Sequence, residues 1–168
     1  MRAPIAIGAR GTVFIFVIIN TESTMQLKAL ASAMEQELME VGFAPLKTKE
    51  AVKTHMEPHQ GTTLLFVNSL CGCAGTGARL GVKMALSTST YLPNHLVTIF
   101  AGVDDEAAAQ VCAYTKPYPP SSPAIALFKD SVLVHFIERH QLKGSTPEDL
   151  DNELQQVLKT HCQQTVVA

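Results

Sequence analysis

Residues 62–74 read TTLLFVNSLCGCA, an apolar segment that runs directly into a pair of cysteines. Its first part, Thr62 to Asn68, is short, rich in β-forming residues and apolar on both faces, as a central parallel strand is. A two-residue turn follows, and a helix is predicted from about Gly72 to Ser87. Cys71 and Cys73 therefore stand where a buried strand gives way to a helix.

The rest of the chain predicts helices and strands that alternate around this strand. Thr24 is predicted to cap a first helix, which Gly42 ends. Further strands are predicted at 94–101, 124–129 and 132–137, and further helices at 49–59, 104–113 and 147–160. A strand–helix–strand order favours parallel pairing, and the last two strands form an antiparallel hairpin. The sequence thus predicts an α/β fold with a central mixed β-sheet flanked by helices.

Three glycines, Gly75, Gly77 and Gly81, interrupt the predicted helix that follows the cysteine pair. Each lowers its helix propensity by about 1 kcal/mol relative to alanine. We expect them to let this helix pack closely on the sheet.

Composition and charge narrow the class of protein. The chain has 168 residues, of which 46% are hydrophobic and 17% charged, as in one globular domain and unlike a disordered chain. The net charge is −2 and the basic residues are scattered, so no surface for nucleic acid is predicted. Four cysteines are too few and too spread out for a disulfide-stapled secreted scaffold. Two of them lie within three residues of each other, which favours redox chemistry or metal binding in a reducing compartment.

The N-terminal segment, residues 1–24, is treated separately. Two arginines precede an apolar run from Val13 to Ile19, which is the order found in a signal peptide. The run is far too short to span a bilayer, and no clear cleavage site follows it. Two interpretations stay open: a mistaken start with translation from Met25, or a real leader or extra strand. Residues 25–168 are predicted to form the domain.

The strand–helix junction suits thiol chemistry at Cys71. The first N–H groups of a helix lack backbone partners, and the positive end of the helix dipole favours an anion such as a thiolate. We therefore expect the pKa of Cys71 to lie below its usual value, which makes this thiol a nucleophile at cellular pH. Gly72 gives the backbone freedom, and Cys73 can attack a mixed disulfide on Cys71 and release the reduced product. One intervening residue makes a strained ring, so we expect the oxidised pair to be readily reduced.

The C-x-C spacing alone also fits other kinds of site. Structural zinc usually needs four Cys or His ligands offered in paired units. The remaining candidates, Cys112, His161 and Cys162, are not paired in this way. A metal or iron–sulfur module and a pair of incidental cysteines stay as alternatives to a redox centre, and no residue is assigned as a metal ligand.

Four residues outside the pair are further candidates. Pro123 directly precedes a predicted strand, and in thioredoxin-like folds a cis proline at this position faces the cysteine pair. The residue before it, Ser122, would offer backbone hydrogen bonds to the substrate; the alternative is an ordinary loop proline. Cys112, mid-helix among alanines, is predicted to be buried and inert. Cys162, near the terminus, is either a third redox thiol or a spectator.

Several separate blocks of the sequence resemble the bacilliredoxin family, in the same order and at the same spacing. The matching blocks are Asn68–Gly75, Ala78-Arg79, Phe100–Gly102 with Asp104, Pro120–Pro123, His135–Ile137 with Arg139-His140, and His161-Cys162. The resemblance covers about Met25 to Cys162. The segment before Met25 departs from the family, and it bears on the localisation rather than on the chemistry.

The resemblance implies a thioredoxin-like fold and a cytoplasmic enzyme that removes bacillithiol from S-bacillithiolated proteins. Some members are also described as weak disulfide isomerases. By this resemblance Cys71 is the attacking thiol, Cys73 the second active-site cysteine and Cys162 the auxiliary thiol, while Ser122 and Pro123 contact the substrate. The implied partners are S-thiolated client proteins, a low-molecular-weight thiol as co-substrate and a flavin-dependent disulfide reductase. No bound cofactor, nucleic acid or membrane is expected.

Overall fold

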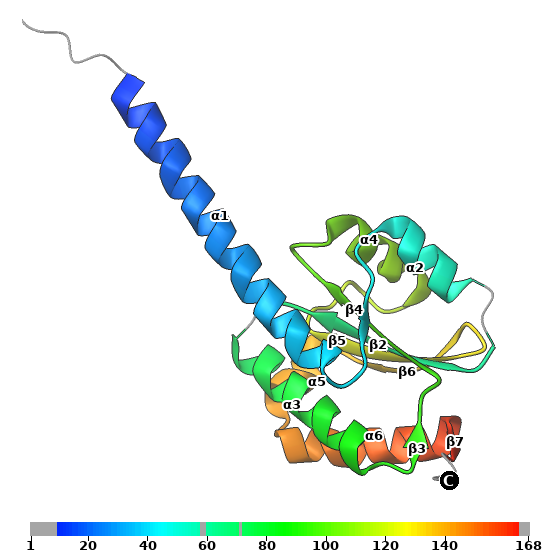
Figure 1. Cartoon of the computed structure of the whole chain (residues 1–168). Helices are drawn as coiled ribbons and strands as arrows, with labels where there is room; N and C mark the ends of the chain where they lie inside the picture. Colours follow the sequence, from blue (N-terminus) through cyan, green and yellow to red (C-terminus); the bar gives the residue numbers. More distant parts are fainter. Residues whose placement is uncertain (1–9, 58–59, 71, 165–168) are drawn as a thin grey trace, which may run out of the picture.

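The structure is a computed structural model that describes residues 10–57, 60–70 and 72–164, with backbone only for residues 10–23 and Cys73. A five-stranded sheet with strand order β1-β4-β2-β5-β6 forms its centre (Figure 1). These strands are β1 (Ala44–Pro45), β2 (Thr62–Asn68), β4 (His95–Phe100), β5 (Ala124–Lys129) and β6 (Val132–Ile137). The first three run parallel, and β5 and β6 are antiparallel to their neighbours. The predicted mixed sheet is confirmed, and its topology is thioredoxin-like.

Helices cover both faces of the sheet, as predicted. They are α1 (Arg10–Met39), α2 (Lys49–Met56), α3 (Gly72–Thr88), α4 (Asp105–Tyr114), α5 (Arg139–Gly144) and α6 (Pro147–His161). A second, two-stranded sheet pairs β3 (Tyr91–Leu92) with β7 (Gln163–Gln164). The sequence did not predict β3, β7, β1 or the helix α5, because each of these elements is too short to show a pattern.

The central strand β2 divides the interior into two cores. All seven of its residues are buried, because β4 and β5 flank it and helices lie on both faces. Leu64 and Phe66 pack with α3 and α6, whereas Leu65 and Val67 pack with α2 and α4. This alternation follows from the two-residue period of a strand and explains why its sequence is apolar throughout.

The prediction that the first helix begins at Thr24 is wrong, because α1 begins at Arg10. A capping residue favours a helix start but does not end a helix that is already running, and no proline lies between Arg10 and Met39. The N-terminal part of α1 extends away from the sheet, and residues 24–30 are all exposed (Figure 1). That residues 1–24 stand outside the domain stays a prediction.

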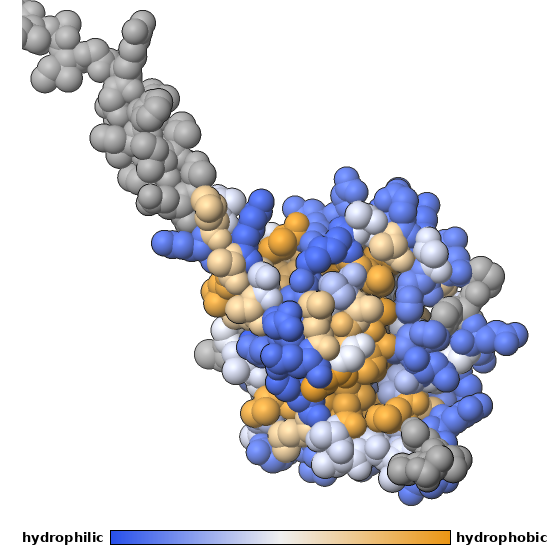
Figure 2. All heavy atoms as spheres, in the orientation of Figure 1, coloured by the Kyte–Doolittle hydropathy of each residue, from blue (hydrophilic) through white to orange (hydrophobic). Residues whose placement is uncertain are grey.

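Apolar side chains gather at the base of α1 and over the middle of the face shown in Figure 2. Met25, Leu27 and Leu30 are among the exposed large hydrophobic residues. Within the described residues, no helix has both the length and the apolar character that crossing a bilayer requires.

The glycines of α3 allow close contacts, but with partners other than the expected sheet. A Cβ at Gly81 would lie 2.9 Å from Leu150 Cβ and from the carbonyl oxygen of Pro147, both in α6. A Cβ at Gly75 would lie 3.2 Å from Arg79 Nη1, whereas one at Gly77 would meet no atom within 4 Å. Gly81 therefore lets α3 approach α6, and Gly75 makes room for a guanidinium.

Candidate active site

Three segments that are distant in sequence meet at one end of the sheet, where β2 and β4 finish and β5 begins. Asn68, the last residue of β2, pairs with Phe100, the last residue of β4. Val67 pairs with Ala124, the first residue of β5, so Pro123 lies beside the chain that leaves β2. This is the end at which the sequence places the cysteine pair.

Helix α3 begins at Gly72, one residue after Cys71, which itself lies outside the described residues. Cys73 belongs to the first turn of this helix. Gly72 is exposed, and no atom would lie within 4 Å of a Cβ added there, so the turn faces open space. The predicted strand–helix junction is confirmed, and the free N–H groups and dipole of a helix start can stabilise a thiolate.

Pro123 is buried, and the peptide bond between Ser122 and Pro123 is cis, as predicted. A second cis bond, between Lys116 and Pro117, was not predicted. The roles of Ser122 and Pro123 in binding a substrate stay predictions.

A polar cluster lies buried behind the turn that leads from β2 to the cysteines. Asn68 is fully buried, and its Oδ1 accepts from the backbone N–H of Ser69 at 3.0 Å and from Arg79 Nη1 at 3.2 Å. Arg79 is only 2% exposed, and its Nε donates to Glu37 Oε2 of α1 at 2.8 Å. Residue chemistry alone did not single out Arg79; only the resemblance contained it, without a role.

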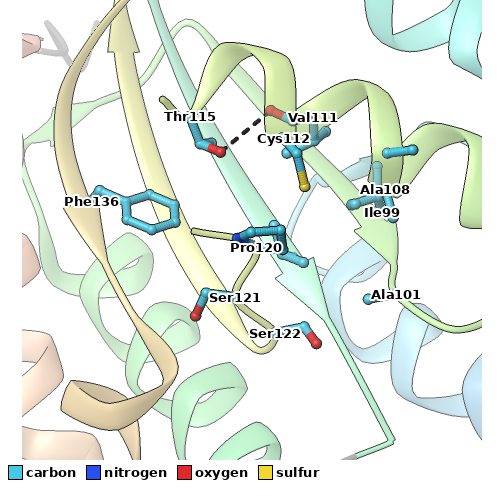
Figure 3. A pocket seen from close by; sticks show the side chains of 12 residues that line it. Ile99, Ala101, Ala108, Val111, Cys112, Thr115, Pro120, Ser121, Ser122 and Phe136 are labelled. Atoms are coloured by element: carbon cyan, nitrogen blue, oxygen red, sulfur yellow. Dashed lines mark hydrogen bonds between the residues drawn. The ribbon is translucent and has the colours of Figure 1, made fainter. Parts of the chain in front are cut away.

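A cavity of about 290 Å³ opens next to this end of the sheet (Figure 3). It lies between α4 and the segment Pro120–Ser122, and its wall is mostly apolar. The lining residues are Val67, Ile99, Ala101, Ala108, Ala109, Val111, Cys112, Thr115, Pro120, Ser121, Ser122 and Phe136. The sequence did not predict it, because its wall comes from six separate stretches of chain.

Cys112 contributes to the wall of this cavity. Its sulfur points into the space between α4 and Pro120 (Figure 3). The residue is only partly buried, whereas the sequence predicted a buried cysteine. A ten-residue helix on the surface of the sheet leaves one flank open, and Cys112 lies on that flank.

Cys162 lies at the opposite end of the molecule from the cysteine pair. Its thiol hydrogen-bonds with Thr62, the first residue of β2, and burial raises the pKa of Cys162. The seven-residue strand β2 separates this end from Asn68 by about 20 Å. Cys162 therefore lies far from the start of α3, which carries Cys73, and its role as an auxiliary thiol stays a prediction.

Metal-ligand geometry is defined only in the part of the chain that the structure describes, which leaves out Cys71 and the side chain of Cys73. There, no group of three or more His, Cys, Asp or Glu side chains lies close enough to hold a metal ion.

Comparison with known proteins places the chain in a family. A family model described as "Disulphide isomerase" matches residues 27–162. A bacilliredoxin of Cytophaga hutchinsonii is 48% identical over 79% of this chain and 97% of its own length. Bacilliredoxin BH1716 of Halalkalibacterium halodurans is 44% identical over 82% of this chain and 94% of its own length. A Bacillus cereus bacilliredoxin is 43% identical over 81% of this chain and 94% of its own length.

Among solved structures, oxidised thioredoxin O2 from Arabidopsis thaliana matches with a TM-score of 0.45 and 16% identity, over 71% of this chain and 96% of that one. The sequence relatives carry the assignment. Together with the topology and the position of the cysteine pair, they show that the chain belongs to the bacilliredoxin family of thioredoxin-like thiol–disulfide oxidoreductases.

Proposed function

We propose that this protein removes bacillithiol from S-bacillithiolated proteins in the cytoplasm, with Cys71 and Cys73 as the exchanging thiols. The observation that carries the proposal is the placement of the C-G-C sequence at the junction where the chain passes from β2 into α3, in a chain whose relatives are named bacilliredoxins. A helix start favours the thiolate at this point of the chain.

The reaction proceeds by two successive exchanges. The Cys71 thiolate attacks the bacillithiol sulfur of the client's mixed disulfide, and the client leaves as a thiolate that takes a proton from solvent. Bacillithiol is then disulfide-bonded to Cys71. The Cys73 thiolate attacks the Cys71 sulfur, bacillithiol leaves as a thiolate, and a Cys71–Cys73 disulfide forms. The client is reduced by two electrons and the cysteine pair is oxidised. A flavin-dependent disulfide reductase, acting with bacillithiol, is the proposed source of electrons for the next cycle.

The surroundings of the pair support a bound adduct. Ser122 and Pro123 lie beside the chain that leaves β2, and the main-chain groups of Ser122 are the proposed hydrogen-bonding partners of the client. Ser121 and Ser122 are among the residues that line the adjoining cavity, and the Ser121 hydroxyl already accepts from the Arg139 N–H. A small polar thiol compound therefore has both volume and hydrogen-bonding groups available.

Adduct trapping tests the proposal directly. The variant Cys73→Ser, recovered from the native host and analysed by intact and peptide mass spectrometry, is expected to carry bacillithiol on Cys71. The matched variant Cys71→Ser lacks the attacking thiol and is expected to carry no adduct at Cys73. Recovery of a different thiol on Cys71 would change the co-substrate, and absence of any adduct would contradict the mechanism.

A second function, general disulfide reduction or isomerisation, is favoured by the description of the matching family model. The two functions differ in substrate preference. Rates should be compared on one client carrying bacillithiol, the same client carrying glutathione, and a protein with scrambled disulfides. A bacilliredoxin prefers the first by about tenfold or more, which corresponds to about 1.4 kcal/mol of transition-state binding. Equal rates on all three substrates would favour the isomerase.

A further inference from the structure

The guanidinium of Arg79 joins three parts of the molecule at the candidate active site. Arg79 lies on α3, and its Nε donates to Glu37 Oε2 of α1 at 2.8 Å. Its Nη1 donates to Asn68 Oδ1 at the end of β2 at 3.2 Å. Its Nη2 lies 3.5 Å from Thr76 Oγ1, one turn back along α3. The side chain therefore folds back toward the helix start that carries Cys73.

The same amide oxygen controls the turn that leads to the cysteines. Asn68 Oδ1 also accepts from the backbone N–H of Ser69 at 3.0 Å, so one buried atom holds both the turn and the guanidinium. Gly75 permits this arrangement, because an added Cβ would lie 3.2 Å from Arg79 Nη1 and 3.4 Å from the Ser69 carbonyl oxygen. The segment at Ser69, the Arg79 guanidinium and the backbone of α3 at Gly75 are thus closely packed against one another.

The cost of burying a guanidinium points to a role for it. A buried charge is expensive unless it is paired, and the carboxylate that pairs with Arg79 belongs to Glu37, whose side chain is 45% exposed. An apolar residue would fill this position at lower cost. What an apolar residue cannot supply is a planar set of donors directed at three elements at once.

We propose that Arg79 is a positioning residue for disulfide closure, which holds the segment 68–70 in a fixed place relative to the first turn of α3. The inference rests on the proposed exchange between Cys71 and Cys73. The chain enters Cys71 from the held segment, and Cys73 belongs to the helix that carries Arg79. The geometry therefore governs the second, intramolecular exchange more than the first, because an intramolecular rate depends steeply on placement whereas a diffusing disulfide finds its own approach.

Ellman's reagent, an aromatic disulfide, separates the two exchanges. In the full-length chain with Cys112→Ser and Cys162→Ser, a substoichiometric amount first releases one thionitrobenzoate as Cys71 attacks. The second thionitrobenzoate leaves when the Cys73 thiolate attacks the Cys71 sulfur, so the pair is oxidised and the reagent reduced. Stopped-flow absorbance gives both rates in the same record.

Replacing the planar guanidinium of Arg79 is expected to slow the release of the second thionitrobenzoate and to leave the release of the first nearly unchanged. In Arg79→Gln the second release should slow between about tenfold and a hundredfold, with the first changed less than about threefold. Arg79→Lys keeps the charge but lacks the planar fork, and it should behave like Arg79→Gln. The control is Lys83→Gln on the same helix, whose side chain is 3.9 Å from Glu40 of α1, and both rates should stay at the reference value.

Three results would overturn the inference: an unchanged second release in Arg79→Gln, restoration of the reference rate by Arg79→Lys, or an equal loss of both phases. If the Arg79 variants unfold, Glu37→Ala provides the test, because this half-exposed carboxylate ties the guanidinium to α1. It should slow the second release by about threefold or more, and an unchanged rate there would also reject the inference. A reference protein that releases only one thionitrobenzoate would contradict the proposed function itself, so the two failures are distinguishable.

Discussion

Gly81 lies at the contact between α3 and α6, and we expect its replacement by alanine to destabilise the fold. A Cβ at this position would lie 2.9 Å from Leu150 Cβ, from Leu150 Cδ2 and from the carbonyl oxygen of Pro147. Carbon atoms in optimal contact are about 3.5–4.0 Å apart. Leu150 Cδ2 can move by rotation of its side chain, but Leu150 Cβ and the Pro147 carbonyl can move only with the backbone of α6.

Two opposing effects set the size of the change. Overpacking a well-packed contact costs about 1–3 kcal/mol. Alanine gains about 1 kcal/mol over glycine in a helix interior. The net change in the free energy of unfolding is therefore a loss of about 0–2 kcal/mol.

Gly77→Ala is the matched control that isolates the packing effect. Gly77 lies on the same helix, and an added Cβ would meet nothing within 4 Å, so this variant receives the propensity gain alone. The two variants should differ by the overpacking cost, about 1–3 kcal/mol, with Gly81→Ala the less stable. Thermal unfolding followed by circular dichroism should then show a difference of about 2–12 °C, since a chain of this size shifts by about 2–4 °C per kcal/mol. A Gly81→Ala protein as stable as Gly77→Ala would refute the reasoning.

Three further predictions concern other parts of the chain. A protein that begins at Met25 should unfold within about 0.5 kcal/mol of the full chain, because residues 24–30 are all exposed; a loss beyond about 2 kcal/mol in urea titration would place the N-terminal segment in the core. Burial raises the pKa of Cys162 in the folded chain, so its neutral thiol contributes stability that is fully present below the ordinary value of 9.0 and is lost as the pH rises from there through the raised pKa. Alkylation should accordingly be slow at Cys162 until urea unfolds the chain, and Cys162→Ser should lack the alkaline loss of stability; fast labelling of native Cys162 at neutral pH would contradict this. Ser121→Ala removes the hydroxyl that accepts from the Arg139 N–H at 2.8 Å, and a loss of about 1 kcal/mol is expected in the same titration, whereas no loss would mean that water replaces the hydroxyl.

The sequence predicted those parts of the fold whose signal is local. Apolar runs bounded by turn residues predict strand β2 and the hairpin of β5 and β6. Pro147 predicts the start of α6. Strand β1, with two residues, has no such pattern and exists only because β4 pairs with it. The start of α1 was missed because a capping residue is a preference that an uninterrupted helix can override.

The parts of the site that depend on tertiary contacts were not predictable. The role of Gly81 follows from Leu150, which lies almost seventy positions further along the chain. Arg79, in a helix of small residues, carries no sign that its guanidinium turns inward to Asn68. The distance of Cys162 from the cysteine pair likewise became evident only once Thr62 and Asn68 were placed at opposite ends of one strand.

The shortness of β1 has a consequence for how this protein can associate with other chains. An exposed sheet edge with free N–H and C=O groups is a template on which another chain can add a strand and aggregate. Here the β1 edge has two residues, and one of them, Pro45, has no N–H to donate. At the other edge, a register shift between Leu127 and Phe128 interrupts the pairing of β5 with β6. Both margins therefore discourage strand addition, which protects the protein from polymerising through the edges of its sheet.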